Sequence, residues 1–272
     1  MFRPFHIAHS SFLIGCMKAM ILAAGLGTRL RPLTNTIPKP LLPVAGTPII
    51  VWNLLLLRRH GFREVMINLH HLGPMIEQTL GDGERYGLRI SYSREPVMLG
   101  TGGGIKQVEP FFSGEPFLVV NGDTLFELDL DALIAFHRRH AAAATLVLRK
   151  DPEAERWGLV EVGSGHRIVR IAGRGVLDTG QTEPRMFTGV HILHPRLLRD
   201  VPKGRASSII DAYVTAIQHG EAVLGYDAEG YWSDVGTPER YAQTERDAEA
   251  GLINLAARKS WCASVPATKG SG

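Results

Sequence analysis

The chain has 272 residues, of which 44% are hydrophobic and 21% are charged. This length and balance indicate one large globular domain with a sizeable core, and they exclude a fibrous or wholly disordered protein. The net charge of +3 is small and the basic residues are scattered among acidic ones, while no stretch reaches the roughly 18 apolar residues that a membrane span requires, so we expect neither a nucleic-acid nor a membrane partner.

The two ends of the chain are predicted to lie outside the domain. The apolar run 12–16 has a distant similarity to a lipoprotein processing site, but histidines and serines interrupt the apolar character before it, and a core strand follows at once. We therefore interpret residues 1–16 as an N-terminal extension, residues 17–250 as the domain and residues 251–272 as a disordered tail. The two cysteines, Cys16 and Cys262, are too few for a disulfide framework and favour the reducing cytoplasm.

Strand and helix patterns alternate through the first half of the chain. Apolar, β-branched runs predict strands over 19–23, 64–69, 88–93 and 117–120, and amphipathic patterns between them predict helices over 48–59, 74–80 and 103–108. This order predicts βαβ units in an α/β fold with a mostly parallel central sheet flanked by helices. Ligands of such sheets bind beyond the carboxyl ends of the strands, which is where the loop at Gly25 and the turn at Asp123 would lie.

The second half is predicted to form a small β-rich insert. Strands are expected over 145–149, 158–162, 168–171 and 187–193, followed by an amphipathic helix over 208–218 and another helix that begins near Pro238. We see no internal repeat, and in particular no hexapeptide array of the kind that forms a β-helix.

The loop after the first strand has the composition of a phosphate-binding segment. It reads G-x-G-T-R from Gly25 to Arg29, and Lys39 follows in a P-K-P sequence. Glycines expose backbone N–H groups, and the two cations would neutralise phosphate oxygens. A dinucleotide fingerprint fails because Leu30 stands where its third glycine is needed, and the chain has no Walker A Gly-Lys-Ser/Thr. The remaining alternative is an ordinary glycine turn with solvated basic residues.

Together, G-x-G-T-R and P-K-P resemble the signature of the sugar-1-phosphate nucleotidyltransferases. The resemblance implies the Rossmann-like nucleotide-diphospho-sugar transferase fold, and transfer of a nucleotidyl group from a nucleoside triphosphate to a sugar 1-phosphate with Mg²⁺ as cofactor. It also implies that Arg29 grips phosphate oxygens and that Lys39 places a point charge near the α-phosphate. The attacking phosphate oxygen is already an anion, so no covalent nucleophile is expected.

Two carboxylates are expected to hold the magnesium ion. Asp123 follows a buried strand, and Asp234 lies in a W-x-D-x-G-T-P segment that matches a late motif of the family. Mg²⁺ prefers one or two carboxylates together with phosphate oxygens and water, which suits such a pair. Taken alone, an aspartate in Gly-Asp-Thr is an ordinary turn or cap residue, so the interpretation depends on the other motifs.

The resemblance also assigns residues to the nucleotide. A second glycine-rich loop, L-G-T-G-G-G, matches the family segment that contacts the nucleobase, although it could also be a flexible turn before a helix. Its triple glycine is similar to that of the N-acetylmuramate 1-phosphate uridylyltransferases. The predicted nucleotide-binding residues are Leu22, Ala23, Ala24, Gly25, Gly27, Thr28, Gly100 and Thr101.

The predicted sugar-binding residues lie on three strands or directly after one of them. They are Asn121, Glu161, Thr188 and Gly189. One departure from the family concerns the sugar phosphate, because many relatives carry an E-K-P motif whose lysine contacts it, whereas this chain has Arg174 in the equivalent region. Either Arg174 substitutes for that lysine or the charge is missing.

Several alternatives remain open at this level. The eleven histidines show no zinc-site spacing, since His137 and His140 share a helix face and His191 and His194 flank a strand end without cysteine or acidic partners. Within the family the chain is most similar to the short uridylyl and guanylyl transferases. A phosphocholine cytidylyltransferase and an inactive nucleotide-sugar-binding subunit are the alternative functions, and a monomer or small homo-oligomer is expected.

Overall fold

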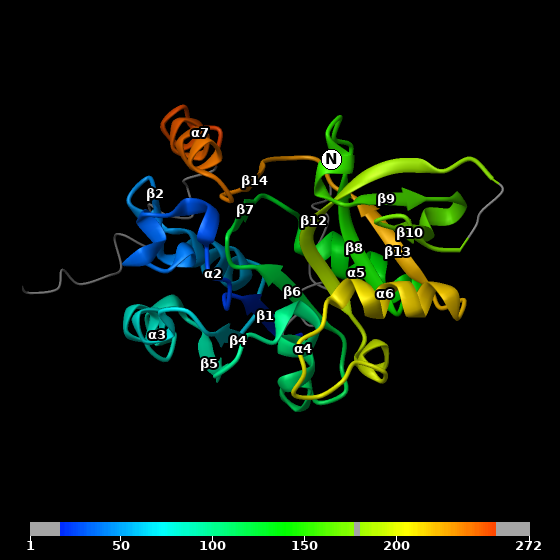
Figure 1. Ribbon diagram of the computed structural model, residues 1–272, viewed down its shortest axis with the longest axis horizontal. Helices are drawn as coiled ribbons and strands as arrows, with labels where there is room; N and C mark the ends of the chain where they lie inside the picture. The colour runs from blue at the N-terminus through cyan, green and yellow to red at the C-terminus, as the bar shows by residue number, and fades with distance from the viewer. Residues whose placement is uncertain (1–16, 177–179, 254–272) are drawn as a thin grey trace, which may run out of the picture.

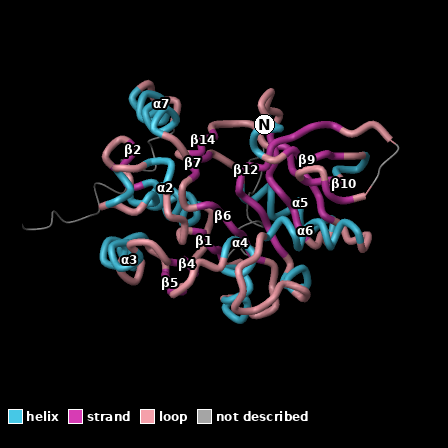
Figure 2. Tube along the Cα trace, in the orientation of Figure 1, coloured by secondary structure: helices cyan, strands magenta, loops and turns pink. Residues whose placement is uncertain are grey.

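The computed structural model describes residues 17–176 and 180–253. The proposed extension 1–16 and nearly all of the proposed tail lie outside the described residues. The described chain contains one ten-stranded sheet with helices on both faces, shown in Figure 1 and, by secondary structure, in Figure 2. The predicted α/β class, with a mostly parallel central sheet flanked by helices, is confirmed.

The first half of the chain forms the parallel part of the sheet. Its strands occur in the order β6-β1-β4-β5, and all three pairings are parallel. Their bounds and those of the helices between them are β1 Ala19–Leu22, α2 Ile49–Arg59, β4 Glu64–Leu69, α3 Gly73–Leu80, β5 Arg89–Arg94, α4 Gly100–Gln107 and β6 Phe117–Asn121. Each predicted element of this half is present, with bounds that differ by three residues or fewer.

The second half continues the same sheet with mostly antiparallel strands. The long strand β12 pairs antiparallel with β6, β8 and β9, and thereby joins the two halves (Figure 1). The elements are α5 Leu130–His140, β8 Ala144–Arg149, β9 Leu159–Val162, β10 Ile168–Ile171, β11 Arg174–Gly175, β12 Glu183–Leu193, α6 Ile209–Gln218 and β13 Val223–Asp227. The sequence did not predict β13, which runs parallel to β8.

Two short strand pairings and the last helix complete the fold. Strand β7 Thr124–Phe126 pairs antiparallel with β14 Trp232–Asp234, so the ends of two distant segments meet beside β6. Helix α7 Pro238–Glu249 follows β14 at once, and its first turn is capped by the Thr237 hydroxyl, which accepts from the Arg240 backbone N–H. Strands β2 Pro43–Val44 and β3 Thr47–Pro48 form a hairpin before α2.

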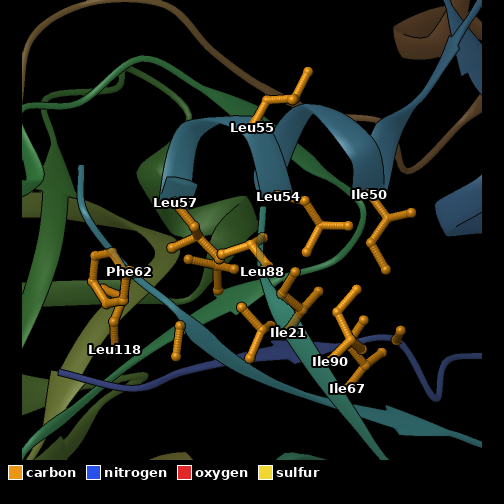
Figure 3. Packing of buried hydrophobic residues seen from close by; sticks show 14 of the residues in the cluster. Ile21, Ile50, Leu54, Leu55, Leu57, Phe62, Ile67, Leu88, Ile90 and Leu118 are labelled. Atoms are coloured by element: carbon orange, nitrogen blue, oxygen red, sulfur yellow. The ribbon is translucent and has the colours of Figure 1, made fainter. Parts of the chain in front are cut away.

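The main core lies between α2 and the parallel strands. Ile50, Leu54 and Leu57 on α2 point toward Ile21 and Ile67 in the sheet, and all five side chains are fully buried or nearly so (Figure 3). Burying a leucine or isoleucine side chain contributes about 1.5–3 kcal/mol each. The packing fixes the strands whose carboxyl ends carry the predicted site.

Two buried histidines are expected to make the fold sensitive to mild acid. Burial lowers the pKa of His191, which hydrogen-bonds Tyr213, to about 3, and burial followed by nearby cations lowers the pKa of His137 to about 4. The two histidines take up a proton near pH 6.5 in the unfolded chain but not in the folded chain. The free energy of unfolding is therefore independent of their titration above that pH and falls below it. We expect a loss of about 2 kcal/mol per histidine by pH 5.

Urea unfolding between pH 8 and pH 5 measures this loss. His191→Gln and His137→Gln should each flatten the pH dependence, because glutamine does not titrate, whereas His219→Gln on the exposed end of α6 should leave it as in the wild type. Equal pH dependence in all four proteins would show that these histidines are protonated without cost in the folded state.

Candidate active site

The predicted nucleotide segments surround one pocket of about 260 Å³ at the carboxyl ends of β1 and β6. All but three of its lining residues were predicted from the sequence, the exceptions being Pro40, Asn68 and Met98. The predicted residues that line it are Leu22, Ala23, Ala24, Gly25, Lys39, Gly100, Thr101, Asn121 and Asp123.

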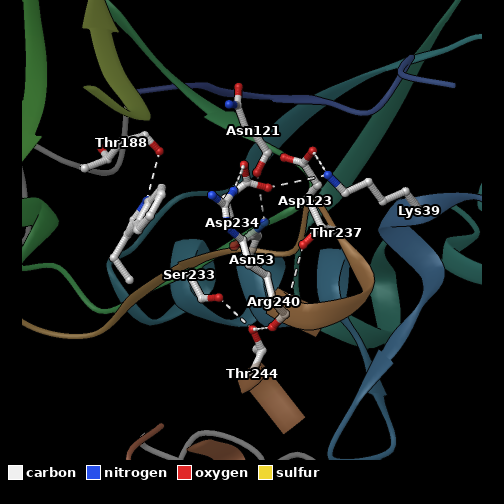
Figure 4. A network of polar contacts seen from close by, with 11 residues as sticks. Lys39, Asn53, Asn121, Asp123, Thr188, Ser233, Asp234, Thr237, Arg240 and Thr244 are labelled. Carbon is white, nitrogen blue, oxygen red and sulfur yellow. Dashed lines mark hydrogen bonds and ion pairs between the residues drawn. The ribbon is translucent and has the colours of Figure 1, made fainter. Parts of the chain in front are cut away.

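The two predicted metal ligands lie side by side, with a lysine between them. The Lys39 ammonium hydrogen-bonds Asp123 Oδ2 and lies 3.5 Å from Asp234 Oδ1 (Figure 4). The pairing of β14 with β7 produces this arrangement, because it sets Asp234 opposite Thr124, the residue after Asp123. Lys39 is only 8% exposed, so its charge acts in a partly desolvated site.

The charge on Asp234 is incompletely compensated. Burial, together with the neighbouring Asp123 carboxylate, raises its pKa, and the cations Lys39, Arg29 and Arg240 offset only part of this effect. Its Oδ1 atom is buried and accepts no hydrogen bond from a described residue. A buried carboxylate oxygen of this kind beside a second carboxylate fits a hard divalent cation with oxygen ligands. The residues present therefore suit Mg²⁺.

Arg29 lies next to the same carboxylate. It is an exposed residue in a short 3₁₀ helix, Thr28–Leu30, and its guanidinium packs against Gly236: a Cβ built there would be 3.1 Å from Arg29 Nη2 and 2.8 Å from Asp234 Oδ1. Glycine at 236 thus leaves room for both charged groups.

At the start of the 3₁₀ helix, Gly27 has a φ of 63°, and its carbonyl accepts a hydrogen bond from the Thr34 hydroxyl at 2.8 Å.

A buried polar bridge connects the two nucleotide segments, and sequence reasoning missed it. Asn68 Oδ1 accepts from the Ala23 N–H at 2.9 Å, and its Nδ2 donates to Glu95 Oε1 at 2.8 Å. Glu95 Oε2 in turn accepts from the Leu99 N–H at 3.0 Å. The sequence signal was a single polar residue inside the apolar run of β4. The bridge holds the first glycine loop and the start of α4 at a fixed separation.

The triple glycine has a packing explanation. The N–H of Gly102 donates to the Ser207 carbonyl at 2.8 Å, and a Cβ on Gly103 would lie 2.3 Å from the Arg205 carbonyl oxygen. The Thr101 hydroxyl accepts from the N–H of Ile209, the first residue of α6, at 2.9 Å. The glycines therefore allow the segment before α6 to approach α4 closely, while Gly100 and Thr101 also line the pocket.

The predicted sugar residues are less tightly grouped. Asn121 lines the pocket, and Gly189, with a φ of 80°, makes room for it, since a Cβ there would be 2.3 Å from Asn121 Nδ2. The Thr188 hydroxyl is buried and donates to the Val147 carbonyl at 2.9 Å, and Glu161 forms an ion pair with Arg170 at 3.4 Å. Of the four, only Asn121 lies in the pocket wall.

Arg174 is engaged elsewhere. Its Nη1 lies 2.9 Å from Asp211 Oδ1 on α6, and both side chains are about half exposed. It is not among the residues that line the pocket. The structure gives no support for Arg174 as a substitute for the E-K-P lysine.

None of the described histidines lines this pocket. His137 hydrogen-bonds Thr145, and His191 hydrogen-bonds Tyr213, both inside the fold. Within the described part of the chain, the one group of three side chains with ligand atoms close enough for a metal is His60, Asp129 and Asp131. These atoms already have partners: His60 Nδ1 lies 3.0 Å from Asp131 Oδ2, and Asp129 Oδ1 accepts from the N–H of Ala132 in the first turn of α5.

None of the helices in the described residues is long and apolar enough to cross a membrane.

The model of the nucleotidyl transferase family matches residues 18–251. An N-acetylmuramate α-1-phosphate uridylyltransferase from Neisseria meningitidis is 40% identical over 234 residues, which cover 84% of this chain and 97% of that protein. A UTP–glucose-1-phosphate uridylyltransferase from Synechocystis is 34% identical over 85% of this chain, and a mannose-1-phosphate guanylyltransferase from Mycobacterium tuberculosis is 32% identical over 87%.

The chain spans 63% of the Synechocystis protein and 66% of the mycobacterial one. Among solved structures, a protein from Bacillus anthracis described as a candidate glucose-1-phosphate thymidylyltransferase superposes with a TM-score of 0.74 at 24% identity, covering 85% of this chain and 95% of that chain. HddC from Yersinia pseudotuberculosis, complexed with GMP-PN, superposes with a TM-score of 0.71 at 23% identity, covering 85% of this chain and 99% of that chain. These two likenesses establish the fold, and the match over residues 18–251 establishes that the chain belongs to the nucleotidyl transferase family.

Proposed function

We propose that the chain transfers a nucleotidyl group from a nucleoside triphosphate to a sugar 1-phosphate. In this reaction a phosphate oxygen of the sugar phosphate bonds to the α-phosphorus, the bond from that phosphorus to the bridging oxygen breaks, and pyrophosphate leaves. The observation that carries the proposal is the placement of Lys39 between Asp123 and Asp234 beside a pocket whose wall is the glycine loop. Such an arrangement suits charge neutralisation rather than nucleophilic catalysis.

Each group has a distinct role in this proposal. The backbone from Leu22 to Thr28 and the Arg29 guanidinium bind the triphosphate, and Gly100 and Thr101 lie against the base. Lys39 stabilises the charge that concentrates on the α-phosphate oxygens as the new bond forms. Mg²⁺, held by Asp123 and Asp234, would supply Lewis-acid neutralisation between the two substrates. Asn121, Glu161, Thr188 and Gly189 are proposed for the sugar side, Gly189 acting through the room that it gives Asn121.

Among acceptors, we propose N-acetylmuramate 1-phosphate with UTP first. The supporting observation is that the Neisseria uridylyltransferase matches along 97% of its own length, so that the two chains have similar extents. Mannose 1-phosphate with GTP is the second candidate. The four charged residues Arg29, Lys39, Asp123 and Asp234 lie in one place, which argues against an inactive sensing subunit. A reaction between two phosphorylated small molecules suits the cytoplasm.

A matrix of substrates tests the proposal. The four nucleoside triphosphates are each mixed with N-acetylmuramate, mannose, glucose and heptose 1-phosphates and with phosphocholine, and pyrophosphate release is measured with Mg²⁺. We expect the highest kcat/KM for UTP with N-acetylmuramate 1-phosphate, and no release from a protein in which both Asp123 and Asp234 are changed to asparagine. Binding of a nucleotide sugar without pyrophosphate release in any combination would identify a sensing subunit instead.

A further inference from the structure

An arginine on the last helix is held over an aromatic platform beside the carboxylate pair. The guanidinium carbon of Arg240 lies 3.8 Å from the centroid of the Trp157 ring. That ring packs edge-on against Trp232, with centroids 5.4 Å apart and an interplanar angle of 82°. The Trp232 indole N–H donates to the Thr188 carbonyl at 3.0 Å, so the platform is anchored to β12. Cation–π contact of this kind fixes the plane of the guanidinium.

The backbone beneath Arg240 is fixed as well. Its N–H donates to the Thr237 hydroxyl at 3.4 Å, and its carbonyl accepts from the Thr244 hydroxyl at 2.8 Å (Figure 4). Its Nη1 forms an ion pair with Asp234 Oδ2 at 3.6 Å, a separation that is beyond hydrogen-bond distance. No described residue accepts a hydrogen bond from this guanidinium, and its side chain is 31% exposed. The donors on the edge of the guanidinium are therefore available to a ligand.

The two carboxylate oxygens of Asp234 face different cations. Lys39 faces Oδ1, on the side of the nucleotide pocket, and Arg240 faces Oδ2. Trp157, on which Arg240 lies, is separated by one residue from β9, the strand that carries the proposed sugar residue Glu161. Arg240 thus lies between the metal-binding carboxylates and the sugar side of the site.

The acceptor must bring anionic oxygens to this place. A sugar 1-phosphate carries about two negative charges, and Arg174, which stands in the region of the lysine that many relatives use for it, is paired with Asp211. Arg29 and Lys39 are assigned to the triphosphate. We propose that Arg240, held on Trp157, binds an anionic group of the acceptor, an inference that rests on the proposed transferase function. The group is either the 1-phosphate, which every acceptor carries, or a carboxylate on the sugar.

Steady-state kinetics of Arg240→Gln tests this role. We expect KM for the acceptor to rise about 10- to 100-fold, as for the loss of a charge-assisted pair, while KM for the triphosphate changes less than about twofold. Trp157→Leu should shift the same constant in the same direction, and Trp157→Phe should largely preserve it, because phenylalanine keeps a ring beneath the guanidinium. Arg246→Gln, an exposed arginine on the same helix, is the matched control.

Two acceptors distinguish the sources of the anion. Of mannose 1-phosphate and N-acetylmuramate 1-phosphate, only the second bears a carboxylate. If Arg240 binds the 1-phosphate, Arg240→Gln raises the acceptor KM by the same factor for both. If it binds the carboxylate, only the second acceptor is affected. Unchanged acceptor KM with both, or an equal rise in triphosphate KM, overturns the proposal, whereas a wild-type protein that releases no pyrophosphate overturns the transferase function instead. Thermal melting of each variant confirms that the fold is retained.

Discussion

Asp123→Asn and Asp234→Asn should each lower metal-dependent turnover by more than about 100-fold, since even partners of metal ligands cost 10- to 100-fold when changed. Each substitution removes an anionic oxygen from a polar site and takes no volume from the core, so both proteins should fold. For Asp234 we expect no loss of thermal stability, because burial and the neighbouring carboxylate raise its pKa and its Oδ1 accepts no hydrogen bond from a described residue. The neutral amide removes a charge that is costly to bury.

Two measurements are needed for this prediction. Pyrophosphate release at saturating Mg²⁺ gives the turnover, and titration with Mn²⁺, followed by electron paramagnetic resonance, gives metal affinity without turnover. Asp211→Asn is the matched control, because Asp211 is an exposed aspartate that pairs with Arg174 away from the pocket. Near wild-type turnover in either variant, or unchanged Mn²⁺ affinity, would show that the two aspartates do not share a metal.

The sequence predicts those parts of the site whose functional residues lie within a few positions of one another in the chain. The loop from Gly25 to Arg29 reads as a phosphate segment by itself, because glycines and cations follow a strand within a few residues. Asp123 likewise follows its own strand. The meeting of Asp123 with Asp234 has no local signal, since it depends on the pairing of β7 with β14, and only the family resemblance predicted it.

What the sequence could not predict depends on tertiary contact. The bridge from Asn68 to Glu95 joins residues 27 positions apart, and although Asn68 is a polar residue inside an apolar strand, nothing local indicates that its partner is Glu95. The contact between Trp157 and Arg240 joins the short 3₁₀ helix Ala154–Trp157, which precedes β9, to the last described helix. The family resemblance assigns Gly100 and Thr101 to the nucleobase and gives no role to Gly102 and Gly103. The close neighbours of these two glycines are the carbonyls of a segment more than 100 residues away.

The secondary structure missed in the second half has a similar cause. Strand β13 is five residues long, contains Gly225 and ends in Asp227, which gives it a weak strand pattern, yet it is held by β8 along its whole length. Strand β12 begins at Glu183 rather than at the expected 187, because its polar first residues pair with β9. In both cases cross-strand pairing overrides local propensity.

Lys39→Ala should lower turnover by about 10²- to 10³-fold, by analogy with the loss of one oxyanion donor, and should weaken triphosphate binding far less. The reason is that the Lys39 charge is worth most when negative charge concentrates around the α-phosphorus in a partly desolvated site. Arg29→Ala should differ, because Arg29 is exposed and is proposed to grip phosphate in the ground state, so triphosphate affinity should fall with turnover. Lys203→Ala, an exposed lysine, is the control for general charge loss.

Lys39 also neutralises the carboxylate pair in the ligand-free protein, so its removal has a second expected result. Without the ammonium beside Asp123 and Asp234, the two carboxylates should bind Mn²⁺ at least as tightly as in the wild type, because a competing cation is gone. Kinetics, calorimetric titration of the triphosphate and Mn²⁺ titration together separate the possibilities. Lost Mn²⁺ affinity in Lys39→Ala would mean that the lysine only positions the carboxylates, whereas unchanged turnover would remove it from the mechanism.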